Sequence, residues 1–158
     1  MLSHPIAPVY DGRSRILILG SFPSARSRET GFFYGHPQNR FWKLLAVLYG
    51  QNVPVSITEK RAFLLSNRLA LWDVIASCEI QGSSDASISN VTANDLSPLL
   101  QAAPVEKIFT NGKTADSLYT KYILPQTQRQ AVCLPSTSPA NAAWTFDRLC
   151  SAWRVILP

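Results

Sequence analysis

The residue types with the greatest chemical potential gather in one short segment, FFYGHPQNRFW, which covers residues 32–42. Five aromatic residues surround a His-Pro pair and an Asn-Arg pair. Aromatic rings supply flat apolar surface, and the side-chain amide of Asn39 can both donate and accept hydrogen bonds. The segment therefore predicts a site made of ring surface and a few polar groups, although Phe41 and Trp42 also have the spacing of core residues on a helix.

The other reactive side chains argue against metal chemistry. Cys78, Cys133 and Cys150 are too far apart for a CxxC pair and cannot all be paired internally. With only His4 and His36 in addition, the chain can build neither a four-cysteine zinc or iron–sulfur site nor the H-x-E…P-C-x-x-C signature of zinc deaminases. We expect no metal and no cofactor, and free thiols in a reducing cytosol.

Length and charge indicate one domain with an uneven surface. The chain has 158 residues, of which 46% are apolar and 16% charged, so we expect a single domain over residues 1–158. Of the net charge of +5, residues 1–45 carry +4. This excess suits a polyanionic partner, although an ordinary solvated surface explains it equally well. The basic residues of this part are Arg13, Arg15, Arg26, Arg28, Arg40 and Lys43.

The elements that must position these groups follow an α/β pattern. ILILG at 16–20 is typical of a strand buried on both faces, which favours a parallel sheet. We expect residues 21–36 to form a long loop and residues 76–90 a polar excursion. The predicted helices cover 37–49, 56–68, 94–102 and 114–123, with a closing helix that carries Trp144, Leu149 and Trp153. The other predicted strands are 69–74, 105–112 and 131–135.

Three of the predicted strands end in polar loops, namely GSFPS, TNG and PSTSPAN. Ligands of open parallel sheets bind at the carboxyl ends of the strands. We therefore expect these loops to meet the aromatic segment at one site. No charged-then-apolar leader and no apolar run of membrane length is visible, which predicts a cytoplasmic protein without a membrane partner.

Six motifs in order, GSFPSARS, TGFFYGHPQNRFWK, LWDVIASC, GSSDASI, FTNG and LPSTSPAN, resemble the uracil-DNA glycosylase superfamily. The chain is most similar to its hypoxanthine-DNA glycosylase branch, followed by the mismatch-specific uracil branch, from about Pro5 to the closing helix. The resemblance implies a three-layer α/β/α sandwich around a four-stranded parallel sheet. It also implies removal of a deaminated base, which must be flipped out of the duplex.

The resemblance assigns roles in base binding and catalysis. Tyr34 occupies the place of the ring that stacks on the flipped base, and Phe22 and Phe33 complete the pocket wall. Asn39 matches the amide that positions water in the hypoxanthine branch; the alternative is that it only binds loop backbone near a helix start. Asn111 is expected to bind the edge of the base, although Asn-Gly is also a plain turn signal.

Further positions are expected to contact DNA. The hydroxyls and backbone N–H groups of the LPSTSPAN loop suit phosphates, and Pro139 with Ala140 suits the gap left by the base. His36 contacts DNA or braces its loop. We interpret Asp73 as structural, and neither Asp73 nor Asp85 as an acid or base. The expected DNA-binding residues are Ser24, His36, Arg40, Ser136, Thr137, Ser138 and Pro139.

Two departures from better-known branches bear on the substrate. Where those branches have GQDP or GINP, this chain has GSFP, so Phe22 replaces the water-activating residue. The LPSTSPAN loop also lacks the His that assists a leaving pyrimidine. Hypoxanthine depends less on that His, because its N7 can take a hydrogen bond or a proton as the bond breaks.

The resulting hypothesis is a monofunctional, metal-free, monomeric DNA glycosylase that hydrolyses the N-glycosidic bond of deoxyinosine and leaves an abasic site. No lysine lies in a motif, so no lyase step is expected. Preference for uracil or xanthine is the nearest alternative. A catalytically silent nucleic-acid-binding module and a hydrolase of free nucleosides are the alternatives of other classes.

Overall fold

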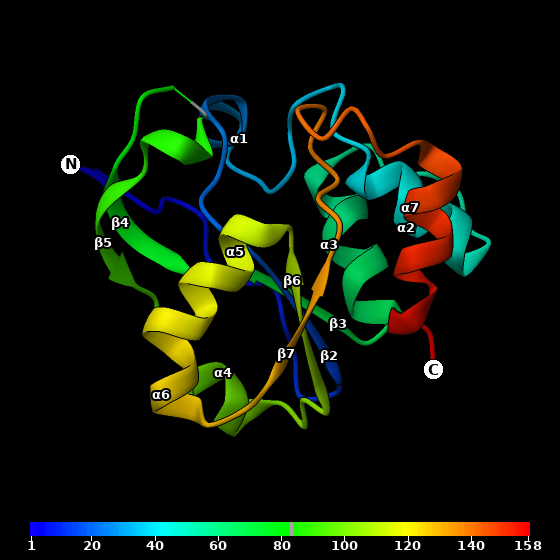
Figure 1. Ribbon diagram of the computed structural model, residues 1–158. Coiled ribbons are helices and arrows are strands. Elements are labelled where there is room, and N and C mark those ends of the chain that lie inside the picture. The colour runs from blue at the N-terminus through cyan, green and yellow to red at the C-terminus, as the bar shows by residue number, and fades with distance from the viewer. Residues whose placement is uncertain (83) are drawn as a thin grey trace.

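The computed structural model describes residues 1–82 and 84–158, and its centre is a four-stranded parallel sheet with the order β3-β2-β6-β7 (Figure 1). The strands are β2 (Ile16–Gly20), β3 (Leu69–Asp73), β6 (Lys107–Asn111) and β7 (Ala131–Leu134). All three pairings are parallel, so the four carboxyl ends lie at one edge of the sheet. This arrangement confirms the expected fold class.

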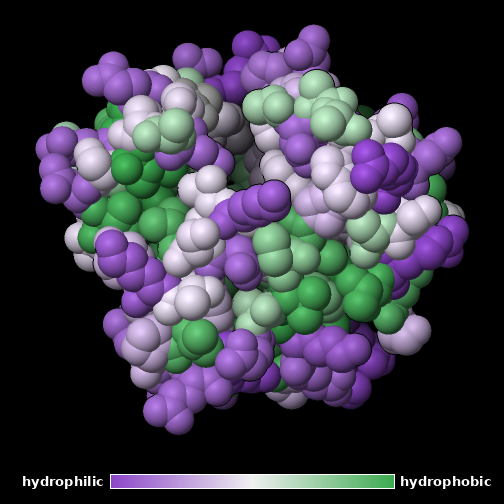
Figure 2. Space-filling model, viewed as in Figure 1, coloured by the Kyte–Doolittle hydropathy of each residue, from purple (hydrophilic) through white to green (hydrophobic). Residues whose placement is uncertain are grey.

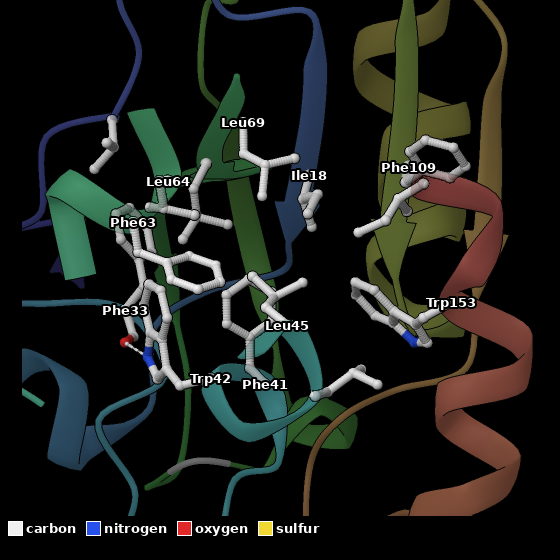
Figure 3. Close-up of a cluster of buried hydrophobic side chains, with 14 of the residues drawn as sticks. Ile18, Phe33, Phe41, Trp42, Leu45, Phe63, Leu64, Leu69, Phe109 and Trp153 are labelled. Carbon is white, nitrogen blue, oxygen red and sulfur yellow. Dashed lines mark hydrogen bonds between the residues drawn. The ribbon is translucent and has the colours of Figure 1, made fainter. Parts of the chain in front are cut away.

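Alternate residues of the central strand β2 bury opposite faces of the sheet, which creates the three layers. Ile18 packs into one apolar core, and Leu17 and Leu19 pack into the other. The first core is covered by α2 (Phe41–Tyr49), α3 (Ile57–Ser66) and α7 (Phe146–Trp153), and Figure 3 shows its aromatic side chains. The second is covered by α4 (Ser97–Ala102), α5 (Lys113–Leu118), a π-helical segment at Tyr119–Ile123 and α6 (Leu124–Thr127).

Helix α2 connects the aromatic segment to the first core. Phe41 and Trp42 are buried there, as the helical spacing predicts, and the Trp42 indole N–H donates to the carbonyl of Phe33 over 3.1 Å (Figure 3). Helix α3 begins with the predicted capping box, in which Ser56 and Glu59 bind each other's backbone N–H groups. Both helices are thereby held at defined positions beside the sheet.

The expected polar excursion at 76–90 is only partly correct, because it contains most of one strand of a second sheet and the start of another. Strands β1 (Leu2–Ser3), β4 (Ile75–Glu79) and β5 (Ser89–Ala93) pair in the antiparallel order β1-β4-β5, and a short 3₁₀ turn covers Asp85–Ser87. Within β4 only Ile75 and Cys78 are buried. The sequence therefore lacks an apolar run here, and the pairing is made by backbone hydrogen bonds.

Two smaller expectations also need correction. The segment predicted as a loop contains helix α1 (Ala25–Thr30), because Ser24 accepts a hydrogen bond from the Ser27 backbone N–H and Gly31 ends the helix with φ 79°. Trp144 precedes α7 rather than lying on it, since Thr145 is the N-cap of that helix. Among the described residues, no helix combines the length and the apolar character that a membrane crossing requires.

Candidate active site

A pocket of about 430 Å³ opens at the carboxyl ends of the parallel strands. In Figure 2 it corresponds to the hollow between two groups of loops at the top of the view. The loops that follow β2, β6 and β7 line this pocket together with the aromatic segment, as the strand-end argument predicts. Of the predicted site residues, only Arg40 does not line it. The predicted site residues that line the pocket are Phe22, Ser24, Tyr34, His36, Asn39, Asn111, Ser136, Thr137, Ser138 and Pro139.

One side of the pocket, which we call the amide wall, consists of Asn39, Asn111 and Thr137, and Arg40 supports it from outside the pocket. The Thr137 hydroxyl donates to Asn39 Oδ1 over 2.9 Å and accepts from Asn111 Nδ2 over 3.0 Å. The Thr137 backbone N–H donates to Asn111 Oδ1 over 3.0 Å. Asn39 Oδ1 also accepts the Phe41 backbone N–H over 3.0 Å, at the first residue of α2. Both amides are therefore held in fixed orientations by one threonine.

Thr137 differs from its expected role as a phosphate contact. It is fully buried, and its hydroxyl is used in both directions by the two asparagines. A hydroxyl in this position cannot reach a phosphate, because its hydrogen points at Asn39 and solvent does not touch it. Its contribution is to join the end of β6 to the start of α2.

Arg40 also differs from the expected contact with DNA. Its guanidinium donates to the backbone carbonyls of Ser138 over 2.9 Å and of Asn141 over 3.1 Å, and it also binds the carbonyls of Thr137 and Trp144. The planar fork of arginine suits several acceptors at once. Arg40 therefore holds the 137–144 loop in place, and most of its donors are unavailable to a phosphate.

A second part of the pocket lining, which we call the carboxylate wall, consists of Gly20, Tyr34, Asp73 and Asp85. Asp73 Oδ2 lies 2.7 Å from His4 Nε2, and both side chains are almost fully buried. His4 Nδ1 accepts the Ile6 backbone N–H over 3.1 Å. A neutral imidazole with one accepting nitrogen carries its hydrogen on the other, so Nε2 donates to Asp73 Oδ2.

Tyr34 brings both its ring and its hydroxyl to the pocket. Its ring stacks on Phe41 with the centroids 4.1 Å apart, and its backbone has φ 52°. Its hydroxyl oxygen is buried, and among the described residues it has no hydrogen-bond partner. Burial raises the pKa of Tyr34 far above its ordinary value of 10.0, and the charge of Asp73 raises it further, whereas the nearby Asn111 amide lowers it. The hydroxyl thus stays protonated as a donor.

Gly20 leaves room between the two polar groups of this wall. A Cβ at residue 20 would lie 2.4 Å from Asp73 Oδ1 and 2.8 Å from the Tyr34 hydroxyl oxygen. Both distances are shorter than van der Waals contact, so both atoms flank the space that a side chain would fill. Asp85 accepts the Ser21 hydroxyl over 3.3 Å, and burial raises the pKa of its carboxyl group. The wall therefore combines one strong donor with carboxylate oxygens.

The remaining predicted residues lie at the rim or shape the loops. Phe22 is nearly buried and meets the edge of the His4 ring at 5.8 Å. Ser24 caps α1, and His36 is exposed, with Nδ1 accepting the Gln38 backbone N–H. The hydroxyls of Ser136 and Ser138 accept backbone N–H groups of their own loop. Pro139 and Ala140 form its exposed tip.

The members of the site that sequence reasoning missed include Asp73, Gly20 and His4. Asp73 was interpreted as structural, yet it ends β3 at the same edge of the sheet as the predicted loops, so the strand-end argument could have found it. Gly20 ends β2 at the same edge of the sheet, so the same argument could have found it. His4 reaches Asp73 from 69 positions away, and nothing in the sequence marks that contact.

No group of three or more metal-ligating side chains occurs in the part of the chain that the structure describes. The walls offer amides, hydroxyls and two carboxylates, and hence hydrogen bonds to a polar ligand with donors and acceptors on its edge. Such a site can orient a planar ligand and a water molecule.

Comparisons with known proteins agree with this geometry. The family model of the uracil DNA glycosylase superfamily matches residues 7–156. The chain is 34% identical to a hypoxanthine DNA glycosylase of Methanosarcina acetivorans over 158 residues, which cover 99% of this chain and 98% of that protein. It is 35% identical over 108 residues to a hypoxanthine DNA glycosylase of Methanosarcina barkeri, covering 67% of this chain and 68% of the relative.

A solved structure is similar over nearly the whole fold. The solution NMR structure of a Methanosarcina acetivorans protein, described as a candidate uracil DNA glycosylase, superimposes with a TM-score of 0.81 at 32% identity and covers 99% of both chains. Family model, relatives and structure thus agree with the motifs and with the pocket. The chain belongs to the uracil DNA glycosylase superfamily.

Proposed function

We propose that this protein is a DNA glycosylase that removes hypoxanthine from DNA by hydrolysing the N-glycosidic bond of deoxyinosine. The observation that carries the proposal is one pocket lined by Tyr34, Asn39 and Asn111, in a chain that resembles hypoxanthine DNA glycosylases along its length. A base reaches such a pocket only after it flips out of the duplex, at a cost of roughly a few kcal/mol. Stacking against aromatic walls offsets part of that cost, on the order of 1–3 kcal/mol per base.

Asn39 is the proposed catalytic residue. Its Oδ1 atom accepts two hydrogen bonds, so the orientation of the amide is set before substrate binds. The Nδ2 hydrogens form no hydrogen bond among the described residues and can hold a water molecule through its oxygen. Such a water keeps a lone pair for attack on a cation-like sugar, for which a positioned dipole matters more than a strong base.

Asn111 is proposed to bind the base. Thr137 uses its Oδ1 and one Nδ2 hydrogen, which leaves the second hydrogen for an acceptor on the base. Hypoxanthine has such an acceptor at N7. Uracil has no N7 and offers only its carbonyl oxygens to this donor.

The proposed DNA contacts surround the pocket. Pro139 and Ala140 lie exposed on the loop that Arg40 holds, and we propose that they fill the gap left by the flipped base. A neighbouring groove that shares Asp85 with the pocket carries Lys113 and Lys121, whose charges suit a phosphate backbone. We further propose that the protein acts as a single-domain monomer in the cytoplasm.

Incubation of the purified protein with lesion-bearing duplexes tests the proposal. Duplexes with hypoxanthine, uracil, xanthine or normal bases are treated in the presence of a chelator and then with alkali. We expect strand breaks at hypoxanthine. Faster cleavage at uracil would favour the activity suggested by the similar NMR structure, and binding without alkali-labile products would indicate a silent binding module. Affinity should fall as salt rises, with a slope that reports the phosphates engaged.

A further inference from the structure

The carboxylate wall contains two polar atoms that the protein leaves without an obvious purpose. The Tyr34 hydroxyl is buried and has no partner within residues 1–82 and 84–158. Asp73 is only 3% exposed; its Oδ2 binds His4, and its Oδ1 lies beside the space at Gly20. A buried polar atom without a partner costs about 1–3 kcal/mol of folding stability. A wall built in this way is suited to a ligand that supplies the missing partners.

The hydrogen-bonding character of the two atoms is defined by their neighbours. The Ile6 N–H group occupies His4 Nδ1, so the His4 Nε2 hydrogen points at Asp73 Oδ2, and Oδ1 remains available as an acceptor. The Tyr34 hydroxyl remains protonated and is a donor. Both atoms flank one point at Gly20, and no hydrogen bond joins them in the described structure. The pocket therefore presents a donor beside an acceptor.

We propose that the Tyr34 hydroxyl and Asp73 Oδ1 recognise the lactam edge of the flipped base, with the hydroxyl donating to O6 of hypoxanthine and the carboxylate accepting its N1–H. This inference rests on the proposed function. Asn111, whose amide lies near the Tyr34 hydroxyl, extends the array with a donor toward N7. Two donors followed by an acceptor then face the sequence N7, O6 and N1–H on the base.

The array predicts which bases are rejected. Adenine presents a donor at N6 and an acceptor at N1, so it opposes both the Tyr34 hydroxyl and the Asp73 carboxylate when the hydroxyl donates. Uracil offers a matching carbonyl and N–H, but it has no counterpart of N7 for Asn111. Guanine has the same three groups as hypoxanthine, so its rejection has to come from the fit around C2. Deamination of adenine thus produces the edge that this wall complements.

The test compares two bases in two variants. Deoxynebularine carries a purine with neither O6 nor N1–H, so it cannot make either proposed contact. We expect Tyr34→Phe to slow release of hypoxanthine about 3- to 10-fold and Asp73→Asn about 10- to 100-fold. Release of the nebularine base should change little in Tyr34→Phe and should not fall in Asp73→Asn, because its N1 is an acceptor. In Asp73→Asn the amide oxygen takes the His4 hydrogen bond and turns the NH₂ group toward the pocket, so discrimination against adenine should weaken.

Matched controls and a second readout keep the outcomes distinct. Tyr49→Phe and Asp147→Asn make the same chemical changes at residues outside the pocket. Both variants should release hypoxanthine and the nebularine base at the wild-type rates. Binding to duplexes with non-cleavable 2′-fluoro analogues of deoxyinosine and deoxynebularine is measured in parallel. If the wild type cleaves neither base but these affinities show the expected pattern, the proposed function fails and the recognition stands. Equal losses on both bases, or none, would refute the recognition itself.

Discussion

The two walls of the pocket are built on opposite principles. In the amide wall, the oxygens of Asn39 and Asn111 and the hydroxyl of Thr137 all have partners, and Arg40 binds four carbonyl groups of one loop. In the carboxylate wall, the Tyr34 hydroxyl is buried without a partner among the described residues. A satisfied network stabilises the fold and holds groups still, whereas an unsatisfied one costs stability until a ligand arrives. The difference suggests that one wall positions the reaction and the other recognises the base.

The largest expected effect is on the amide wall. Asn39→Ala should reduce single-turnover release of hypoxanthine by about 100- to 1,000-fold, because the positioned amide is lost. The unfolding free energy should fall by about 1–3 kcal/mol, because Oδ1 accepts two hydrogen bonds, one of them from the buried Thr137 hydroxyl. The neighbouring exposed residue provides a control, and Gln38→Ala should retain wild-type rates. Full activity in Asn39→Ala would remove this residue from the mechanism.

Arg40→Lys should break the support of the 137–144 loop. A lysine cannot reach several carbonyls with one planar group, so the unfolding free energy should fall by about 2–3 kcal/mol. Affinity for duplex DNA should fall as well, since the loop tip would lose its position. Chemical denaturation and DNA titration measure the two effects. Arg61→Lys on the exposed side of α3 is the control, and an equal effect there would show that the loop contacts contribute nothing.

The comparison of the two walls predicts that a substitution at Tyr34 changes the unfolding free energy in the opposite direction. Tyr34→Phe removes a buried hydroxyl without a partner, so the unfolding free energy should rise by about 1 kcal/mol while hypoxanthine release falls. Gain of stability with loss of activity is the signature of a group retained for its ligand. A loss of stability, seen as a lower denaturation midpoint, would mean that the hydroxyl has a partner in solution and that the walls do not differ.

The smallest expected effect concerns Asp85 and pH. Burial raises the pKa of its carboxyl group above 3.8, the charge of Asp73 raises it further, and hydrogen bonds from Ser21 and Thr114 lower it. The folded state therefore binds this proton more tightly, and the carboxyl group reduces stability as the pH rises from near its unfolded pKa past its folded pKa. Asp85→Asn should raise the midpoint of thermal unfolding at pH 7 by less than about 3 °C and have no effect near pH 3. An equal shift at both pH values would exclude the charge as the cause.

The parallel sheet and its strand-end site could be predicted because their signals are local. ILILG is apolar without interruption, and the motifs after the strands have the turn residues that loops need. The antiparallel sheet was missed because its strands bury few side chains, and backbone pairing leaves no apolar pattern. Helix α1 was missed because five of its six residues are polar and its signal is a single serine cap.

Within the site, the residue types were predictable but their partners were not. The motifs alone brought Tyr34, Asn39 and Asn111 into consideration, and the structure places all three on one pocket. Thr137 and Arg40 were expected to meet DNA because hydroxyl and guanidinium groups bind phosphates well. Thr137 binds Asn39 and Arg40 binds Ser138 over 98 positions of the chain in each case, and Asn111 lies 26 positions from Thr137. No spacing rule connects such residues.

The sequence by itself determined the chemistry available to this protein: amides, rings and hydroxyls at strand ends, without a cysteine or histidine set for a metal. Only the tertiary structure decided which of these groups have hydrogen-bond partners within the protein and which do not. The reason is physical, because a hydrogen bond depends on distance and direction between atoms that the fold brings together. Residue type sets only what each atom can donate or accept.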